Sequence, residues 1–307
     1  MRPSRAMRLA SSPLATALML ATGFCVLSLL GKDPWAAFTV FFIEPFSSLY
    51  GVGELLLKAT PLMICAVGLA LGYRANVWNI GAEGQLTVGA IAGSGVALFH
   101  AAALGAWALP LMLLAGIAGG MLWAALPALL RTRFNTSEIF VSLMLVYIAQ
   151  LFLSYLVHGP WRDPAGQNFP ESQAFADNAM LPMLVDGARA NWGFALALAF
   201  ALLALIGGGA AGLAGIVEVA GPIGMLQPVI SPGYGFTAII VAFVGRLHPI
   251  GIVFAALLMA ALYLGGESAQ IELQLPASVS GVFQAVLLFF LLAAELFIHF
   301  RLRRVHS

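Results

Sequence analysis

The sequence predicts an all-α protein, a polytopic bundle of transmembrane helices with about ten spans in one domain that covers residues 1–307. Hydrophobic residues make up 61% of the chain and charged residues 9%, and the mean hydropathy is +0.97. A chain of this composition cannot fold around one soluble core, because most of its surface would be apolar. Its apolar residues also fall into runs of about 20 residues, which is the length of helix that crosses a hydrocarbon core.

The predicted spans begin close to the N-terminus. Arg2, Arg5 and Arg8 precede an apolar run at residues 13–31 that resembles a signal peptide. The run lacks a small-x-small cleavage site, so we expect it to remain as the first span. Residues 35–57 contain a proline, serines and acids, and we expect short interfacial helices there. The other spans are predicted at residues 59–73, 79–99, 106–130, 138–157, 191–206, 208–229, 231–245, 248–265 and 278–299.

Basic residues set the predicted orientation. If the N-terminus is inside, seven arginines fall on the cytoplasmic side, as the positive-inside rule expects; these are Arg74, Arg131, Arg133, Arg246, Arg301, Arg303 and Arg304. Both termini are therefore predicted to be cytoplasmic. The longest hydrophilic segment, residues 158–190, becomes an external loop that either docks an external protein or is a solvated connection.

The glycines at residues 207–209 leave two interpretations of the region around them. Residues 192–214 either form one continuous span or two spans joined by a turn at these glycines. A single span would place the C-terminal arginines outside, so we favour the turn. No basic residue would hold this turn at the cytoplasmic surface, because residues 190–245 contain no Lys or Arg.

The chain shows no arrangement typical of an enzyme, a metal centre or a cofactor site. Its five histidines are dispersed, and neither HExxH nor GxSxG occurs. Cys25 and Cys65 lie in apolar runs without CxxC spacing, which favours two buried small hydrophobic residues. A net charge of +1 argues against nucleic-acid binding. Glycines and alanines at 93–95, 116–120 and 210–215 predict close helix packing.

The segment from Asn79 to Gln85 is the strongest indication of a functional site. It places two amides, the Glu83 carboxylate and two glycines at the head of an apolar run. Polar groups and non-helical backbone persist at membrane depth only where they face protein or water. Glu83 therefore either bonds the broken end of its own helix or lines and gates a translocation route, and the two roles are compatible.

Two other acids are candidate gating or structural groups. Glu138 follows Ser137, where a helix cap and an acid that complements the helix dipole favour a structural role. Glu218 has no basic neighbour in the sequence. Its carboxyl group must therefore be solvated, protonated or hydrogen-bonded to a neighbouring helix.

Several stretches of the chain carry a family resemblance. The run from Gly72 to Gln85, followed by residues 135–155, 210–221 and 231–251 in the same order, resembles permease subunits of ABC importers for nucleosides and simple sugars. This group is served by binding lipoproteins of the basic-membrane-protein type. The similarity covers most of residues 35–300.

The resemblance implies a non-enzymatic subunit that forms a translocation pathway in the bacterial inner membrane and needs no cofactor. Its implied partners are a second permease subunit of the same or a homologous chain, a cytoplasmic ABC ATPase and an external substrate-binding lipoprotein. Candidate pathway residues are Asn79, Glu83, Gln85, Tyr147 and Gln150. The loop that carries Arg131 and Arg133 is the candidate surface toward the ATPase.

One part of the family pattern is missing from this chain. Family members carry a basic cytoplasmic segment with a coupling helix near positions 206–208, whereas Ile206 here runs directly into glycines. ATP coupling is therefore expected to be impaired. An alternative is an ion-coupled secondary transporter of a small polar solute that would use Glu83, Glu138 or Glu218.

Overall fold

The computed structural model describes residues 5–166, 169–184, 188–203 and 207–299, and helices dominate these ranges. Within them there is no β-strand, only an isolated bridge between Met183 and Asn191. The all-α prediction is therefore confirmed. The first half contains α1 (Arg5–Leu29), α2 (Pro34–Phe42), η1 (Glu44–Phe46), α3 (Leu49–Arg74), α4 (Ala82–Leu104), η2 (Gly105–Trp107), α5 (Ala108–Phe134) and α6 (Glu138–His158).

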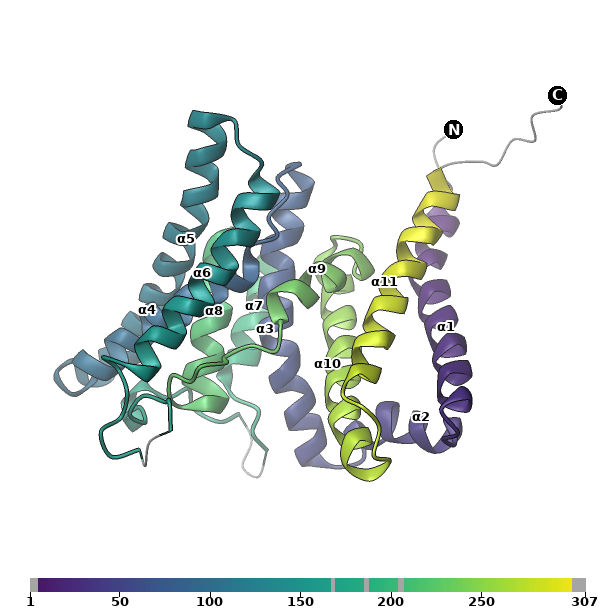
Figure 1. The fold of residues 1–307 in the computed structure, drawn as a ribbon, viewed down its shortest axis with the longest axis horizontal. Helices are drawn as coiled ribbons and strands as arrows, with labels where there is room; N and C mark the ends of the chain where they lie inside the picture. The colour runs from purple at the N-terminus through teal and green to yellow at the C-terminus, as the bar shows by residue number, and fades with distance from the viewer. Residues whose placement is uncertain (1–4, 167–168, 185–187, 204–206, 300–307) are drawn as a thin grey trace.

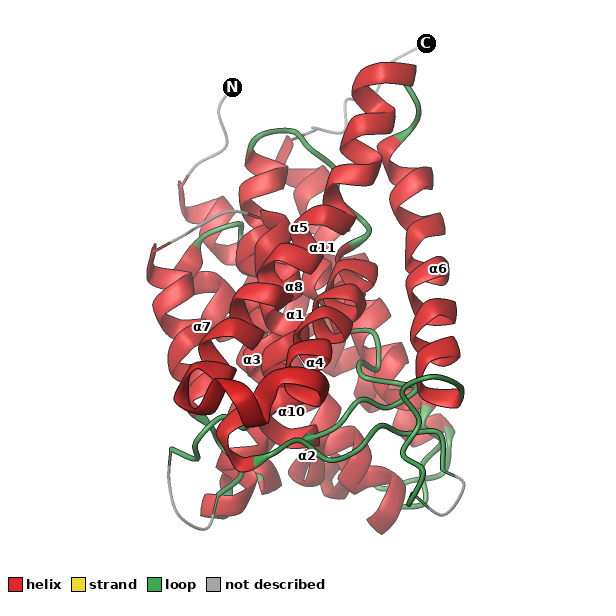
Figure 2. Ribbon diagram, turned by 90° about the vertical axis from the view of Figure 1, so that its left-hand side faces the viewer, coloured by secondary structure: helices red, strands yellow, loops and turns green. Residues whose placement is uncertain are grey.

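The second half begins with a long irregular connection that contains one short 3-10 turn. Its elements are η3 (Asp177–Ala179), α7 (Trp192–Leu203), α8 (Gly207–Glu218), the π-helical turn η4 (Val219–Ile223), α9 (Tyr234–Val244), α10 (Pro249–Glu272) and α11 (Ser278–His299). The helices run between two ends of the bundle (Figures 1 and 2). We call the end where α1 starts and α11 ends the upper end, as drawn in Figure 1, and the opposite one the lower end.

Several helical stretches are long and apolar enough to cross a membrane by length and composition. They are α3, the stretch 82–134 that contains α4 and α5, α6, and α10. Shorter apolar helices lie within α1, α8 with η4, α9 and α11. The connection between α6 and α7 gathers at the lower end (Figure 2).

Several helix boundaries differ from the predicted spans, and two of the differences have a clear local cause. Helix α3 starts at Leu49, ten residues before the predicted span, because Ser48 caps it by accepting a hydrogen bond from the Gly51 N–H at 2.9 Å. The second part of the segment 35–57 therefore belongs to a long helix.

The prediction of helix throughout 208–229 is wrong. The helical backbone ends at Ile223, next to Pro222, and Gly224 has a φ of 74°. Proline removes a backbone donor, and a left-handed residue ends a helix. From there the chain runs without regular structure to Gly233, and α9 starts about halfway up the bundle (Figure 1).

Small residues bring α4, α5 and α8 into close contact. A Cβ atom added to Gly89 of α4 would overlap the backbone of Gly212 in α8, and one added to Gly212 would overlap the Gly116 carbonyl of α5. These positions confirm the prediction of close helix packing. Membrane helices need such contacts because lipid gives them no hydrophobic reason to associate.

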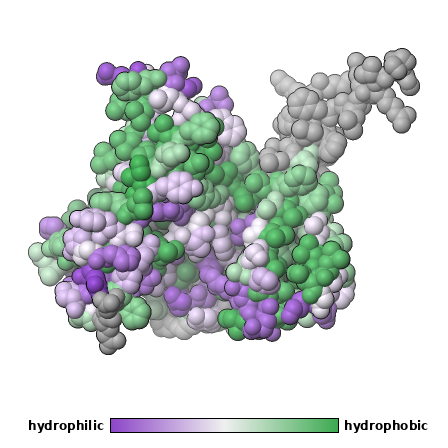
Figure 3. Space-filling view, viewed as in Figure 1, coloured by the Kyte–Doolittle hydropathy of each residue, from purple (hydrophilic) through white to green (hydrophobic). Residues whose placement is uncertain are grey.

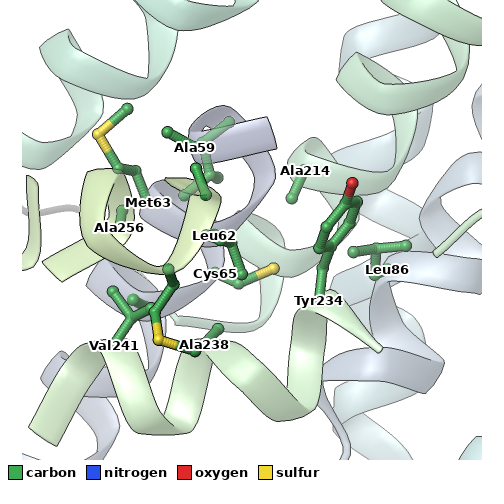
Figure 4. Packing of buried hydrophobic residues seen from close by; sticks show 14 of the residues in the cluster. Ala59, Leu62, Met63, Cys65, Leu86, Ala214, Tyr234, Ala238, Val241 and Ala256 are labelled. Carbon is green, nitrogen blue, oxygen red and sulfur yellow. The ribbon is translucent and has the colours of Figure 1, made fainter. Parts of the chain in front are cut away.

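The buried core continues from these helices toward α9 and α10. Figure 4 shows Leu62 and Cys65 of α3 near Ala238 and Val241 of α9, and all four side chains are buried. The interpretation of Cys25 as a buried residue is wrong, since this side chain is exposed on α1. Helix α1 packs mainly against α11 and α2.

The packing at Gly212 leads to a test of stability. Gly212→Ala is expected to destabilise the protein by about 1–3 kcal/mol, because the new methyl group overpacks a contact between helix backbones. The measurement is the thermal unfolding midpoint of the purified protein in detergent.

The matched control is Gly281→Ala, where an added Cβ meets nothing within 4 Å. Because alanine favours a helix over glycine, this change should leave the midpoint unchanged or raise it. Equal midpoints for the two variants would contradict the packing argument.

Candidate functional site

The site begins where the chain enters α4. After α3 ends, residues 75–81 are not helical. The side-chain amides of Asn79 and Gln85 hydrogen-bond to each other between this segment and the first turn of α4. Asn79 Nδ2 donates to Gln85 Oε1 at 3.0 Å, and Gln85 Nε2 donates to Asn79 Oδ1 at 3.1 Å. Asn79 Oδ1 also accepts from the Gly81 N–H at 2.9 Å. The broken start of α4 is therefore held by two side-chain amides.

A second helix start faces this segment. Glu83, in the first turn of α4, accepts a hydrogen bond at Oε2 from the Gly235 N–H at 2.6 Å. Gly235 lies in the first turn of α9, and a Cβ added there would overlap the backbone of Glu83. The Ser231 hydroxyl also contacts the Glu83 carboxylate. We call the contact of Glu83, Ser231 and Gly235 the junction.

Helix dipoles favour a carboxylate at the junction. Unpaired N–H groups at the start of a helix attract negative charge, and α9 directs its start at Glu83. Glu83 is only 2% exposed. The Oε2 atom of Glu83 bonds across to α9 rather than to its own helix. The hypothesis that it lines or gates a route remains a hypothesis.

Tyr234 lies beside the junction. Its buried ring is next to Leu86 of α4, and its hydroxyl points toward Ala214 of α8 (Figure 4). The start of α9 is thus enclosed by α4 and α8. Sequence analysis did not single out Ser231, Tyr234 or Gly235 as site residues. Their signal was the Ser-Pro-Gly run before an apolar helix, since Ser231 Oγ accepts from the Tyr234 N–H at 2.7 Å as a helix cap does.

An upper cavity of about 190 Å³ adjoins the Asn79–Gln85 pair. It lies near the upper end, since its walls include the last turns of α3 and α5 and the first turn of α6. Its lining includes Trp78, Asn79, Gln85, Glu138 and Ser142.

Glu138 connects the first turn of α6 to other residues around this cavity. Its carboxylate accepts from the Trp78 N–H at 3.2 Å and lies 4.0 Å from Arg131 Nε. Ser137 makes no side-chain capping bond. The expected side-chain cap of α6 is therefore wrong, whereas Glu138 lies in the first turn as expected, and its carboxylate bonds the non-helical segment before α4.

A group of charged residues lies toward the lower end. Arg189 pairs with Glu54 of α3 at 3.3 Å, and Lys58 pairs with Glu267 of α10 at 2.8 Å. Glu218 is buried at the end of α8, within electrostatic range of Lys58, Arg189 and Glu54. Two cations and an acid that are distant in the sequence therefore lie near Glu218, which the sequence order did not reveal.

The structure brings only some of the predicted site residues together. Asn79, Glu83 and Gln85 form one cluster, and Glu138 joins it through the upper cavity. Tyr147 and Gln150 point outward from α6, with Tyr147 58% exposed. Glu218 belongs to the lower charged group instead. Arg131 and Arg133 are exposed in the last turn of α5, at the upper end (Figure 1).

The fold and the site define a class of protein. Two helices start inside an apolar bundle, and their polar starts meet at one buried carboxylate. Interrupted helices whose N-termini converge within a membrane bundle are typical of transport proteins.

Comparison with known proteins identifies the family. Residues 51–206 match the family model described as branched-chain amino acid transport system, permease component. The glucose ABC transporter permease TsgB13 of Haloferax volcanii is 34% identical, over 94% of this chain and 89% of the relative. The guanosine ABC transporter permease NupP of Bacillus subtilis is 26% identical, over 90% and 91%. The nucleoside permease NupB of Lactococcus lactis is 24% identical, over 88% and 86%.

No solved structure matches the chain. The chain belongs to the family of transport-system permease components described by that model, and it is a multi-pass permease subunit of an ABC importer. All the named relatives are ABC permeases, so the comparisons give no support to an ion-coupled secondary transporter.

The junction leads to a test of how α9 is held. Glu83→Ala leaves the Gly235 N–H without its acceptor and should cost about 1–3 kcal/mol. The expected result is faster hydrogen exchange in peptides from the start of α9, measured by mass spectrometry, together with a lower unfolding midpoint.

Glu83→Gln is the matched control, because its carbonyl oxygen can still accept from the Gly235 N–H. Its exchange should be closer to that of the unaltered protein. Unaltered exchange at the start of α9 in Glu83→Ala would show that the carboxylate does not hold this helix.

Proposed function

We propose that this chain forms the translocation pathway of an importer that carries nucleosides or related simple sugars across the bacterial inner membrane. The observation that carries this proposal is the junction, where two interrupted helices meet at Glu83 within an apolar bundle. The substrate class is supported by the relatives, which are named for glucose, guanosine and nucleosides.

The upper end faces the cytoplasm in this proposal, and the chain crosses the membrane about ten times with both termini inside. Support comes from the arginines: Arg74 ends α3, and Arg131 and Arg133 lie in the last turn of α5. These helix ends lie at the upper end, where α1 starts and α11 ends (Figure 1). Basic residues concentrate on the cytoplasmic side of membrane proteins.

The junction separates two sides of the pathway. The upper cavity lies near the cytoplasmic end in this proposal, and the contact between Glu83 and Gly235 holds α9 against α4 next to it. Passage of a solute requires α9 to move relative to α4, so breaking this bond is a step of alternating access. An external binding lipoprotein delivers the solute to the lower end, and a cytoplasmic ABC ATPase acts near Arg131 and Arg133.

The pathway is completed by a second permease subunit. Tyr147 and Gln150 face outward from α6, and Gln150 is an exposed amide in the middle of an apolar helix. A polar side chain is rarely placed against lipid, because hydrocarbon offers it no hydrogen bonds. We therefore assign this face of α6 to contact with the second permease, of the same or a homologous chain.

This assignment is tested by photo-crosslinking in membranes that contain the assembled transporter. Tyr147 is replaced by p-benzoylphenylalanine, and the expected product is a covalent adduct with a permease chain, identified by mass spectrometry. The matched control is the same replacement at Phe254 of α10, which is 68% exposed and should crosslink to lipid.

A permease adduct from Phe254 with none from Tyr147 would contradict the assignment of α6. It would move the subunit contact to α10.

One part of the proposal is specific to this chain. It concerns the segment that couples a permease to its ATPase. The alignment with the Haloferax relative spans 342 positions, more than the 307 residues of this chain, so the relative carries residues that this chain lacks. The family match also ends at residue 206. Residues 204–206 lie outside the described ranges. Both findings support a missing cytoplasmic segment near 206–208.

We therefore expect the chain to couple weakly to its ATPase. Solute-stimulated ATP hydrolysis by the reconstituted transporter should be low, and inserting the corresponding segment of a relative after Ile206 should raise it. A Gly/Ser insert of equal length serves as control and should not. Full stimulated hydrolysis by the chain without an insert would contradict this prediction.

A further inference from the structure

A second polar cavity lies on the other side of the junction, toward the lower end. It has a volume of about 250 Å³ and is lined by α10, α11 and the segment that leads into α9. Its polar lining consists of Tyr263, Glu267, Gln270 and Gln284, and Pro232 forms the wall next to α9. Hydrophilic residues gather around the lower ends of α10 and α11 on the face shown in Figure 3. We call this space the lower cavity.

The lower cavity reaches the start of α9 through Tyr263. The Tyr263 hydroxyl lies 2.7 Å from Thr237 Oγ1 of α9 and is also hydrogen-bonded to Gln284 of α11. The Tyr263 ring meets the Tyr234 ring edge to face, with centroids 5.7 Å apart. Tyr234 directly precedes Gly235, whose N–H is held by Glu83. Contacts between side chains therefore connect this cavity to the junction.

The charges of the lower cavity balance. Glu267 Oε1 accepts from Lys58 Nζ at 2.8 Å, while the Glu267 side chain remains 53% exposed. A carboxylate held in this way still has acceptor positions for a ligand, since each of its oxygens carries two lone pairs. Because Lys58 is engaged by Glu267, this cavity suits an uncharged ligand better than a phosphate or a carboxylate.

The polar groups of the lower cavity match hydroxyl groups. Two amides, each able to donate and accept, stand with a carboxylate and a phenol around one small space. A solute with several hydroxyls can donate to Glu267 and exchange hydrogen bonds with Gln270 and Gln284. The volume of about 250 Å³ lies just below the roughly 300–1,000 Å³ range of ligand sites. This size suits a monosaccharide or the sugar of a nucleoside.

From this geometry we infer that the lower cavity is the outward-facing binding site for a neutral polyhydroxylated solute, with Glu267, Gln270 and Gln284 as its recognition groups. The inference rests on the proposed function, which makes the lower end external. The two cavities then lie on opposite sides of the junction. A solute bound in the lower cavity contacts the elements that must separate for α9 to move.

The test is protection of a cysteine inside the lower cavity. Gly281 lines the cavity, and an added Cβ there meets nothing within 4 Å, so Gly281→Cys is expected to fold. The exposed Cys25 is first changed to Ser, whereas Cys65 is buried. The full chain in lipid nanodiscs is then labelled with a polar maleimide, with and without D-glucose, D-ribose or guanosine.

At least one of these probes should slow labelling of Gly281→Cys saturably. The expected decrease is about threefold when the probe reaches twice its Kd, because free sites fall as 1/(1 + [L]/Kd). Gln284→Leu and Gln270→Leu should abolish the protection. Gln274→Leu is the matched control and should retain it, since Gln274 donates to the Ile271 carbonyl and does not line the cavity.

Labelling does not depend on ATP, so its outcome is separate from that of transport. Protection without uptake by a reconstituted transporter that carries the relative's coupling segment after Ile206 would support the binding site and contradict the proposed function. Uptake of a probe that gives no protection would overturn the binding site and leave the function standing. Absence of both, or protection that survives Gln270→Leu and Gln284→Leu, would also overturn the site.

Discussion

The structure depends on one constraint: a backbone interrupted inside an apolar bundle must find hydrogen-bond partners within the protein. The interruptions before α4 and before α9 meet this constraint together. Asn79 and Gln85 hold the first, and Glu83 supplies the acceptor for Gly235 at the second. A single carboxylate thus joins two helix starts that lie 152 residues apart in the chain.

Close packing makes this arrangement possible. Gly235 lets the start of α9 approach the backbone of Glu83, and the contact of Gly89 with Gly212 holds α8 against α4. Any larger residue at these positions would separate the helices and leave the polar groups of the junction without partners.

Much of the fold was predictable because each membrane helix must be apolar along its own length. Apolar runs predicted α6 and α11 nearly to the residue, as 138–157 and 278–299 against helices of 138–158 and 278–299. The prediction failed where local signals compete. Helix was expected through residue 229, but Pro222 and Gly224 end it by Ile223. In the site, Asn79, Glu83 and Gln85 were found because they are neighbours in the sequence, whereas Ser231 and Gly235 were missed.

The sequence by itself determined that this is a bundle of apolar helices with a polar interruption at residues 79–85, because composition and local order are properties of one segment at a time. Only the tertiary structure decided which groups of other segments form hydrogen bonds with the residues of that interruption. It brought Gly235 to Glu83, and Lys58 and Arg189 within range of Glu218. These pairings form between distant segments and are set by how helices pack, so no local pattern records them. The lower cavity arises in the same way, from α10, α11 and the chain before α9.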